Sequence, residues 1–154
     1  MPSNPNKIII SDTTSLIGLT NIGQIDILRK LFGSVIVTPE VAKEYGDPLP
    51  EWIFVQAVSD SEKIKILNKF IGLGESSSIA LALETENALL ILDDKRARQF
   101  TISLGLEITG TLGLLIRAYK NNIIKDIDSV IAKLRKADFR LPANTEALVK
   151  AIKK

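Results

Sequence analysis

Five acidic residues of this 154-residue chain directly follow an apolar stretch or a glycine turn. Acidic residues in such positions can form a shared catalytic or metal-binding site. They are Asp12, Glu40, Glu75, Asp93 and Asp94. The chain contains no histidine and no cysteine. Histidine-based acid–base catalysis, Ser-His triads, thiolate chemistry and the usual zinc sites are therefore excluded. Any chemistry must come from carboxylates, hydroxyl groups, lysine and arginine.

The first of these acids comes directly after a run of isoleucines at 8–10 and one serine. Three isoleucines in a row leave no polar face, which is typical of a strand buried on both faces in a parallel sheet. Asp12 and the hydroxyl residues 13–15 are good residues for starting a helix. At the carboxyl end of such a strand, Asp12 would lie where open α/β sheets bind ligands. It could equally serve only as the N-cap of the next helix, and this residue alone leaves both interpretations open.

Strand and helix patterns alternate along the rest of the chain. Further strands are expected at 34–37, 52–58, 88–92 and 106–109, the one at 52–58 at the edge of the sheet. Helices are expected at 14–21, 24–32, 39–45, 60–70, 76–86, 95–104, from 111, around 127–134, and at 142–153. Glycines 72 and 74 are expected to form a turn before Glu75. The alternation predicts a three-layer α/β/α fold with a central parallel sheet. We expect a single domain over 1–154, with a flexible lead-in at 1–6 and a C-terminal helix within 142–154.

The strand ends bring the acids together in this fold, because all strands of a parallel sheet end at one edge. Each acid alone is explained by its favourable interaction with a helix N-terminus, worth about 0.3–1 kcal/mol. Converging carboxylates repel, however, by about 4 kcal/mol for two charges ~4 Å apart at an effective dielectric constant of ~20. A bound cation would remove this repulsion. Ligand sets made only of oxygen favour Mg²⁺ or Mn²⁺.

The charges are unevenly distributed along the chain. Residues 1–90 carry 7 Lys/Arg and 11 Asp/Glu, whereas residues 91–154 carry 13 and 7. Lys95, Arg96 and Arg98 directly follow the last acidic pair, where they could hold the phosphates of RNA. The alternative is that these basic residues form an ordinary solvated helix face.

Five motifs of this chain resemble the PIN-domain superfamily of metal-dependent ribonucleases, over roughly residues 7–140. The similarity is strongest to its poorly characterised branch related to the toxins of toxin–antitoxin pairs. The motifs are Ile-Ser-Asp-Thr-Thr-Ser-Leu-Ile at 10–17, Val-Thr-Pro-Glu-Val at 37–41, Gly-Leu-Gly-Glu-Ser at 72–76, Leu-Asp-Asp-Lys-Arg-Ala-Arg at 92–98 and Gly-Thr-Leu-Gly at 110–113. Together they are specific, and each alone is weak.

The resemblance implies a role for each residue of the site. Asp12, Glu40, Glu75 and Asp94 would be the catalytic acids, with Mg²⁺ or Mn²⁺ on Asp12, Glu75 and Asp94. Asp94 matches the family acid better than Asp93, because it directly precedes the basic start of a helix. Thr13, Thr14, Asp93 and Thr111 would support the ligands or position a water. Thr111 stands where many relatives have a further acid, so this chain has one charged ligand fewer.

The function implied by the resemblance is metal-dependent hydrolysis of phosphodiester bonds in single-stranded or structured RNA. A toxin role, an antitoxin partner and a homodimer are expected on the same basis. No signal-peptide core and no apolar run of about 18 residues occurs, so we expect a cytoplasmic protein outside the membrane.

Two alternatives remain open. The first is a PIN-like module that binds RNA or protein without cutting. The second is a phosphatase similar to the haloacid dehalogenases, which would need a second acid two residues after the first. That position is Thr14 here.

Overall fold

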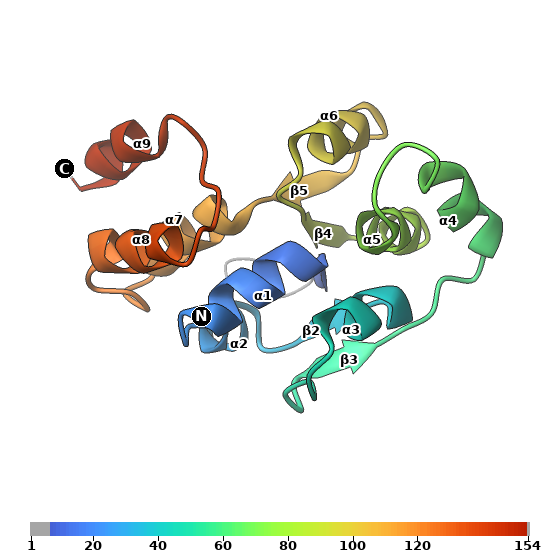
Figure 1. Cartoon of the computed structure of the whole chain (residues 1–154), viewed down its shortest axis with the longest axis horizontal. Helices are drawn as coiled ribbons and strands as arrows, with labels where there is room; N and C mark the ends of the chain where they lie inside the picture. Colours follow the sequence, from blue (N-terminus) through green and yellow to red (C-terminus); the bar gives the residue numbers. More distant parts are fainter. Residues whose placement is uncertain (1–6, 154) are drawn as a thin grey trace.

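The computed structural model describes residues 7–153, so the lead-in expected at 1–6 lies outside the described residues. Within that part of the chain, strands and helices alternate (Figure 1). The strands are β1 (Ile8–Ser11), β2 (Val35–Val37), β3 (Ile53–Val55), β4 (Ala88–Ile91) and β5 (Glu107–Thr109). The helices are α1 (Thr13–Asn21), α2 (Asp26–Phe32), α3 (Pro39–Tyr45), α4 (Ser61–Leu67), α5 (Leu73–Leu83), α6 (Lys95–Ser103), α7 (Thr111–Lys120), α8 (Ile127–Lys136) and α9 (Thr145–Ile152).

The five strands form one parallel sheet in the order β3-β2-β1-β4-β5. Strand β1 lies in the middle, with Ile10 beside Ile36 of β2 and Leu90 of β4. The isoleucine run therefore forms the centre of the sheet, and Asp12 follows it at the carboxyl edge. The predicted three-layer α/β/α fold is confirmed.

Strand β1 is buried on both faces because successive side chains point in opposite directions. Ile9 packs in a core with Leu16 of α1 and Leu115 of α7. Ile10 packs in a second core with Ile79 of α5. Both isoleucines are nearly inaccessible, at 4% and 0% exposed. This double burial fixes the position of the residue that follows the strand.

The caps and turns of the chain determine where its helices begin. Helix α3 starts as expected, with Thr38 Oγ1 accepting a hydrogen bond from Val41 N at 3.1 Å and proline at the first helical position. Helix α5 starts earlier than expected, at Leu73, with Gly72 as its N-cap. The turn predicted at 72–74 is thus wrong, because Gly74 already lies in the helix. Glu75 consequently lies in the first turn of α5.

The described helices are short, with 7 to 11 residues each. None of those within residues 7–153 has both the length and the apolar character needed to span a membrane. Figure 1 shows α8 and α9 at one end of the molecule and α4 at the other.

Candidate active site at the carboxyl edge of the sheet

Asp12 lies at the carboxyl edge of the central strand, almost completely buried at 1% exposed. Its Oδ1 accepts a hydrogen bond from Ser15 N and its Oδ2 accepts one from Asp93 N, both at 3.2 Å. The first bond makes Asp12 the N-cap of α1. The second joins it to the residues that follow β4. Asp12 is therefore both the N-cap of α1 and a buried acid at the carboxyl edge of the sheet.

Asp93 is held beside Asp12 by the start of α7. Its Oδ1 accepts a hydrogen bond from Thr111 N at 2.9 Å, and its Oδ2 accepts one from Thr111 Oγ1 at 2.6 Å. The hydroxyl of Ser15 lies 2.8 Å from that of Thr111. Since the Thr111 hydroxyl donates to Asp93, Ser15 donates to Thr111. Ser15 thus binds Asp12 through its amide and supports Asp93 through its hydroxyl.

The environment of Asp12 disfavours its ionised form. Burial raises the pKa of the Asp12 carboxyl from its ordinary value of 3.8 to about 8, and the nearby charge of Asp93 adds to the rise. The amides of Ser15 and Asp93 partly oppose this shift, and Glu75 contributes a smaller increase. Asp93 and Glu75 therefore lie close enough to Asp12 to disfavour its ionised form.

This shift predicts how the stability of the metal-free protein depends on pH. The pKa of Asp12 is higher in the folded than in the unfolded state, so protonated Asp12 favours the folded state. This stabilisation is fully present below about pH 4, where Asp12 is protonated in both states. It is lost as the pH rises toward 8, because the folded protein must then ionise a buried group. One pKa unit is worth about 1.4 kcal/mol, so the loss is on the order of a few kcal/mol. Urea unfolding of the wild type and Asp12→Asn from about pH 4 to 9 measures it.

The difference between these two proteins isolates Asp12, because all other titrating groups are shared. Asparagine cannot accept both amide hydrogens, so near pH 4 the variant is expected to be about 1 kcal/mol less stable. Toward pH 9 it is expected to become the more stable protein. Asp126→Asn is a matched control, since Asp126 caps α8 in the same way, accepting from Ser129 N, but is exposed. A pH-independent difference for Asp12→Asn would contradict this interpretation.

A further acid, Glu44, lies at the same edge although the sequence did not single it out. Thr13 Oγ1 donates to Glu44 Oε1 at 2.5 Å, and Gly74 N donates to Glu44 Oε2 at 3.2 Å. A Cβ on Gly74 would overlap Glu44 Oε1 and stand 2.9 Å from Thr13 Oγ1. Glycine at 74 thus leaves room for the Glu44 carboxylate, and Glu44 links α1, α3 and α5. Its spacing of one helical turn after Glu40 is the signal that could have found it.

The remaining predicted acids lie at the edge in different ways. Glu40 is half-buried, and its Oε1 is buried without a hydrogen-bond partner among the described residues. The carboxylate of Glu75 folds back over Gly72, with Oε1 2.5 Å from where a Cβ would stand. Asp94 is exposed and caps α6, accepting from Ala97 N at 2.9 Å. The structure therefore brings Asp93, not Asp94, beside Asp12.

Hydroxyl and basic residues complete the edge. Thr14 is exposed in the first turn of α1, whereas Thr13 is buried. Lys95 and Arg96 are exposed at the start of α6. Arg98 is half-buried, and its Nη1 donates to the Leu92 carbonyl at 3.4 Å.

The carboxylate oxygens at this edge are of the chemical type that binds a divalent cation. Asp12 and Asp93 offer adjacent carboxylates, and Glu40 offers a buried oxygen without a partner among the described residues. Such hard oxygen donors are the ligands that Mg²⁺ and Mn²⁺ prefer. Within residues 7–153, however, no three acidic, histidine or cysteine side chains come together as a complete ligand set. A third carboxylate would have to turn toward Asp12 and Asp93, with Glu75 the nearest by its effect on the pKa of Asp12.

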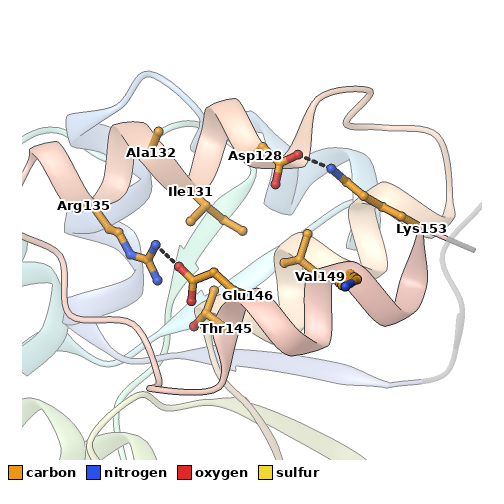
Figure 2. A pocket seen from close by; sticks show the side chains of 9 residues that line it. Asp128, Ile131, Ala132, Arg135, Thr145, Glu146, Val149 and Lys153 are labelled. Atoms are coloured by element: carbon orange, nitrogen blue, oxygen red, sulfur yellow. Dashed lines mark hydrogen bonds and ion pairs between the residues drawn. The ribbon is translucent and has the colours of Figure 1, made fainter.

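A cavity of about 290 Å³ lies elsewhere, between α8 and α9. Figure 2 shows Ile131 and Val149 pointing into it, with the ion pairs Arg135–Glu146 and Asp128–Lys153 at its rim. None of the acids of the sheet edge lines this cavity. It is therefore separate from the candidate site.

Comparison with known proteins agrees with the fold and with the sequence motifs. A family model described as a PIN domain matches residues 8–154. No curated protein and no solved structure shows a significant match to the chain. PIN domains have a nuclease-type fold and generally use divalent metal ions. The resemblance seen in the sequence motifs is confirmed, and the chain belongs to the PIN domain family.

Proposed function

We propose that this protein is a metal-dependent ribonuclease that hydrolyses phosphodiester bonds at the carboxyl edge of its sheet. The observation that carries the proposal is the buried carboxylate of Asp12, hydrogen-bonded to the amide of Asp93 and raised in pKa by its surroundings. A buried carboxylate beside a second one is costly in a purely structural role. Perturbed acids of this kind are concentrated at functional sites.

Each residue of the edge would have a distinct part in the reaction. Asp12, Asp93 and Glu75 would hold Mg²⁺ or Mn²⁺. When bound, the ion would polarise the phosphate and lower the pKa of a water molecule. Thr111 fixes the orientation of Asp93 by binding both of its carboxylate oxygens. Thr14, which is exposed beside Asp12, would bind a water or a phosphate oxygen.

The direct test is cleavage of a labelled single-stranded RNA by the purified protein. Cleavage is expected with millimolar Mn²⁺ or Mg²⁺ and is expected to stop when the metal is chelated. RNA that stays intact with every divalent metal, while still binding the protein, would favour the second candidate function. That candidate is a module that binds RNA or protein without cutting, and it is supported by the hydrogen bonds that both oxygens of Asp93 and both oxygens of Glu44 already accept.

The basic start of α6 would bind the RNA beside the acids. Replacing Lys95, Arg96 and Arg98 together by glutamine is expected to weaken binding to all RNA sequences alike, because phosphate contacts carry little sequence information. The slope of log affinity against log salt should flatten by about 0.7 for each phosphate of a single strand that the variant no longer neutralises. Fluorescence anisotropy across a salt series measures both effects.

The matched control for this experiment lies on α8. Glutamine at positions 133, 135 and 136 removes three cations from a helix at the far end of the molecule (Figure 1). We expect the salt slope to stay unchanged in that control. A slope that flattens there and not in the α6 variant would move the RNA path to α8.

The partners of the protein are also proposals, and they rest on the family alone. RNA would be the substrate, and an antitoxin protein and a second copy of the chain would be binding partners. Light scattering that returns the mass of a single chain throughout the micromolar range would exclude the homodimer.

A further inference from the structure

Gly110 leaves a notch at the carboxyl edge between β5 and α7. A Cβ at this position would overlap Arg98 Nη1 and stand 2.9 Å from Asp93 Oδ1. The backbone of Gly110 has φ −107°, which any residue adopts, so the glycine matters here for the room that it leaves to these two side-chain ends and not for its conformation. The guanidinium of Arg98 and the carboxylate of Asp93 therefore border the same small volume.

Arg98 differs in this respect from the two basic residues before it. Lys95 and Arg96 are exposed at the start of α6, where they can bind phosphate groups of RNA without regard to its sequence. Arg98 is half-buried and turned back onto the strand end, where Nη1 donates to the Leu92 carbonyl. Its other guanidinium N–H groups form no hydrogen bond with the described residues, and the guanidinium lies near Asp93. Among the described residues, the guanidinium of Arg98 and the carboxylate of Asp93 lie near each other without forming an ion pair, and the one hydrogen bond of that guanidinium goes to the Leu92 carbonyl.

We propose that Arg98 is a catalytic residue, which binds a non-bridging oxygen of the phosphodiester that is cleaved. The proposal rests on the ribonuclease function proposed above. Asp12 and Asp93 would hold a metal that polarises the phosphate, and the guanidinium of Arg98, which borders the same notch as Asp93, would bind one of the phosphate oxygens. A planar guanidinium suits this task, because its fork of N–H donors matches the geometry of phosphate oxygens.

The role of Arg98 in the reaction is electrostatic. In the hydrolysis, the water oxygen forms a bond to phosphorus while the bond from phosphorus to the departing ribose oxygen breaks. One proton of the water ends on that ribose oxygen. Arg98 neither gives nor takes a proton, and it stabilises the charge on the phosphate oxygens in the transition state.

The same geometry predicts that Arg98 favours cleavage but weakens the binding of the metal. A fixed positive charge beside Asp93 opposes a divalent cation at the same acids. Removing the guanidinium is therefore expected to tighten Mn²⁺ binding several-fold, whereas the loss of a metal ligand would weaken it. A variant that binds the metal better and reacts more slowly is a combination that neither a ligand nor a merely structural residue would produce.

The experiment compares the wild type, Arg98→Ala, Arg98→Lys, Arg96→Ala and Arg29→Ala with one RNA substrate in Mn²⁺. Calorimetry gives the Mn²⁺ affinity of each, and kinetics give kcat and KM. For Arg98→Ala we expect kcat to fall about 100-fold, as for the loss of one transition-state donor. Guanidinium chloride at tens of millimolar should restore part of kcat, and the same concentration of sodium chloride should not.

The other variants separate this role from general phosphate binding. Arg98→Lys retains the charge, so its Mn²⁺ affinity should stay near that of the wild type while kcat falls through the loss of the fork. Arg96→Ala should mainly raise KM and gain nothing from guanidinium. Arg29, an exposed arginine of α2 paired with Asp26, is the neutral control and should change neither constant.

The outcomes distinguish this inference from the function on which it rests. If the wild type cleaves RNA and Arg98→Ala cleaves it with the same kcat, the inference is overturned and the ribonuclease stands. A fall in kcat with no guanidinium rescue and no tighter Mn²⁺ binding would also overturn it. If the wild type binds Mn²⁺ but does not cleave, the ribonuclease and the catalytic role of Arg98 are both overturned, and tighter Mn²⁺ binding by Arg98→Ala would show only that its guanidinium lies near the metal. A wild type that neither cleaves RNA nor binds Mn²⁺ overturns both.

Discussion

Asp12→Asn is expected to lower Mn²⁺-dependent RNA cleavage by about a thousandfold or more, equivalent to ~4 kcal/mol of transition-state stabilisation. Asp12 is buried at the end of the central strand, and the amides of Ser15 and Asp93 hold its two oxygens. Asparagine keeps the shape but removes the charge that would bind the metal. Single-turnover cleavage of a labelled RNA measures the loss.

The same variant is expected to lose most of its stabilisation by Mn²⁺. A ligand that binds only the folded state adds about 2.7 kcal/mol when present at 100 times its dissociation constant. Thermal unfolding with increasing Mn²⁺ should therefore shift the wild type and leave Asp12→Asn nearly unmoved. Asp126→Asn, the exposed cap of α8, should respond like the wild type. If Mn²⁺ raises the melting temperature of Asp12→Asn as much as that of the wild type, Asp12 is only a helix cap and not a metal ligand.

The second large effect is expected to separate two neighbouring aspartates. Asp93→Asn should lower cleavage about 100-fold, because Asp93 lies beside Asp12 and its carboxylate binds both donors of Thr111. Asp94→Asn should leave cleavage within about twofold of the wild type. Asp94 is exposed and caps α6, and asparagine caps a helix nearly as well as aspartate.

The pair is matched in charge, size and sequence position, so each variant controls for the other. Both steady-state cleavage and the Mn²⁺ dependence of the melting temperature should be affected more by Asp93→Asn than by Asp94→Asn. An inactive Asp94→Asn together with an active Asp93→Asn would restore the assignment that the sequence favoured. It would also mean that the residues after β4 rearrange when the metal binds.

The fold could be predicted from the sequence because its signals are local and strong. Three isoleucines in a row predicted a doubly buried strand, and β1 is that strand. The Thr38-Pro39 pair marked the start of α3 to the residue. Helix α6 also begins as expected, at Lys95 after its N-cap Asp94, whereas the helix expected at 60–70 begins at Ser61 after the N-cap Asp60 and ends at Leu67. Because strand and helix alternate, the parallel sheet followed from chirality and short connections.

The site could be predicted only to within a residue or a helical turn. Asp93 and Asp94 are adjacent, and which one faces Asp12 depends on the backbone between β4 and α6. The pattern favoured Asp94 because it precedes the basic helix. Its role as N-cap explains that position equally well.

The two acids of α3 show the same limit. Glu40 stood at the strand end, but Glu44, one turn later, makes the contacts to Thr13 and Gly74. Those contacts depend on α5 beginning at Leu73, three residues before the helix that was expected. The one-turn spacing places Glu44 on the same face of α3 as Glu40, but nothing local in the sequence indicates that α5 approaches it.

The central claim is that the acids at the carboxyl edge bind a divalent metal. A crystal soaked in Mn²⁺, with anomalous diffraction collected at the manganese edge, tests it most directly. We expect an anomalous peak about 2.0–2.3 Å from carboxylate oxygens of both Asp12 and Asp93, with Glu75 turned toward it. A peak at Asp94 alone, or no peak at the edge in several millimolar Mn²⁺, would contradict the claim.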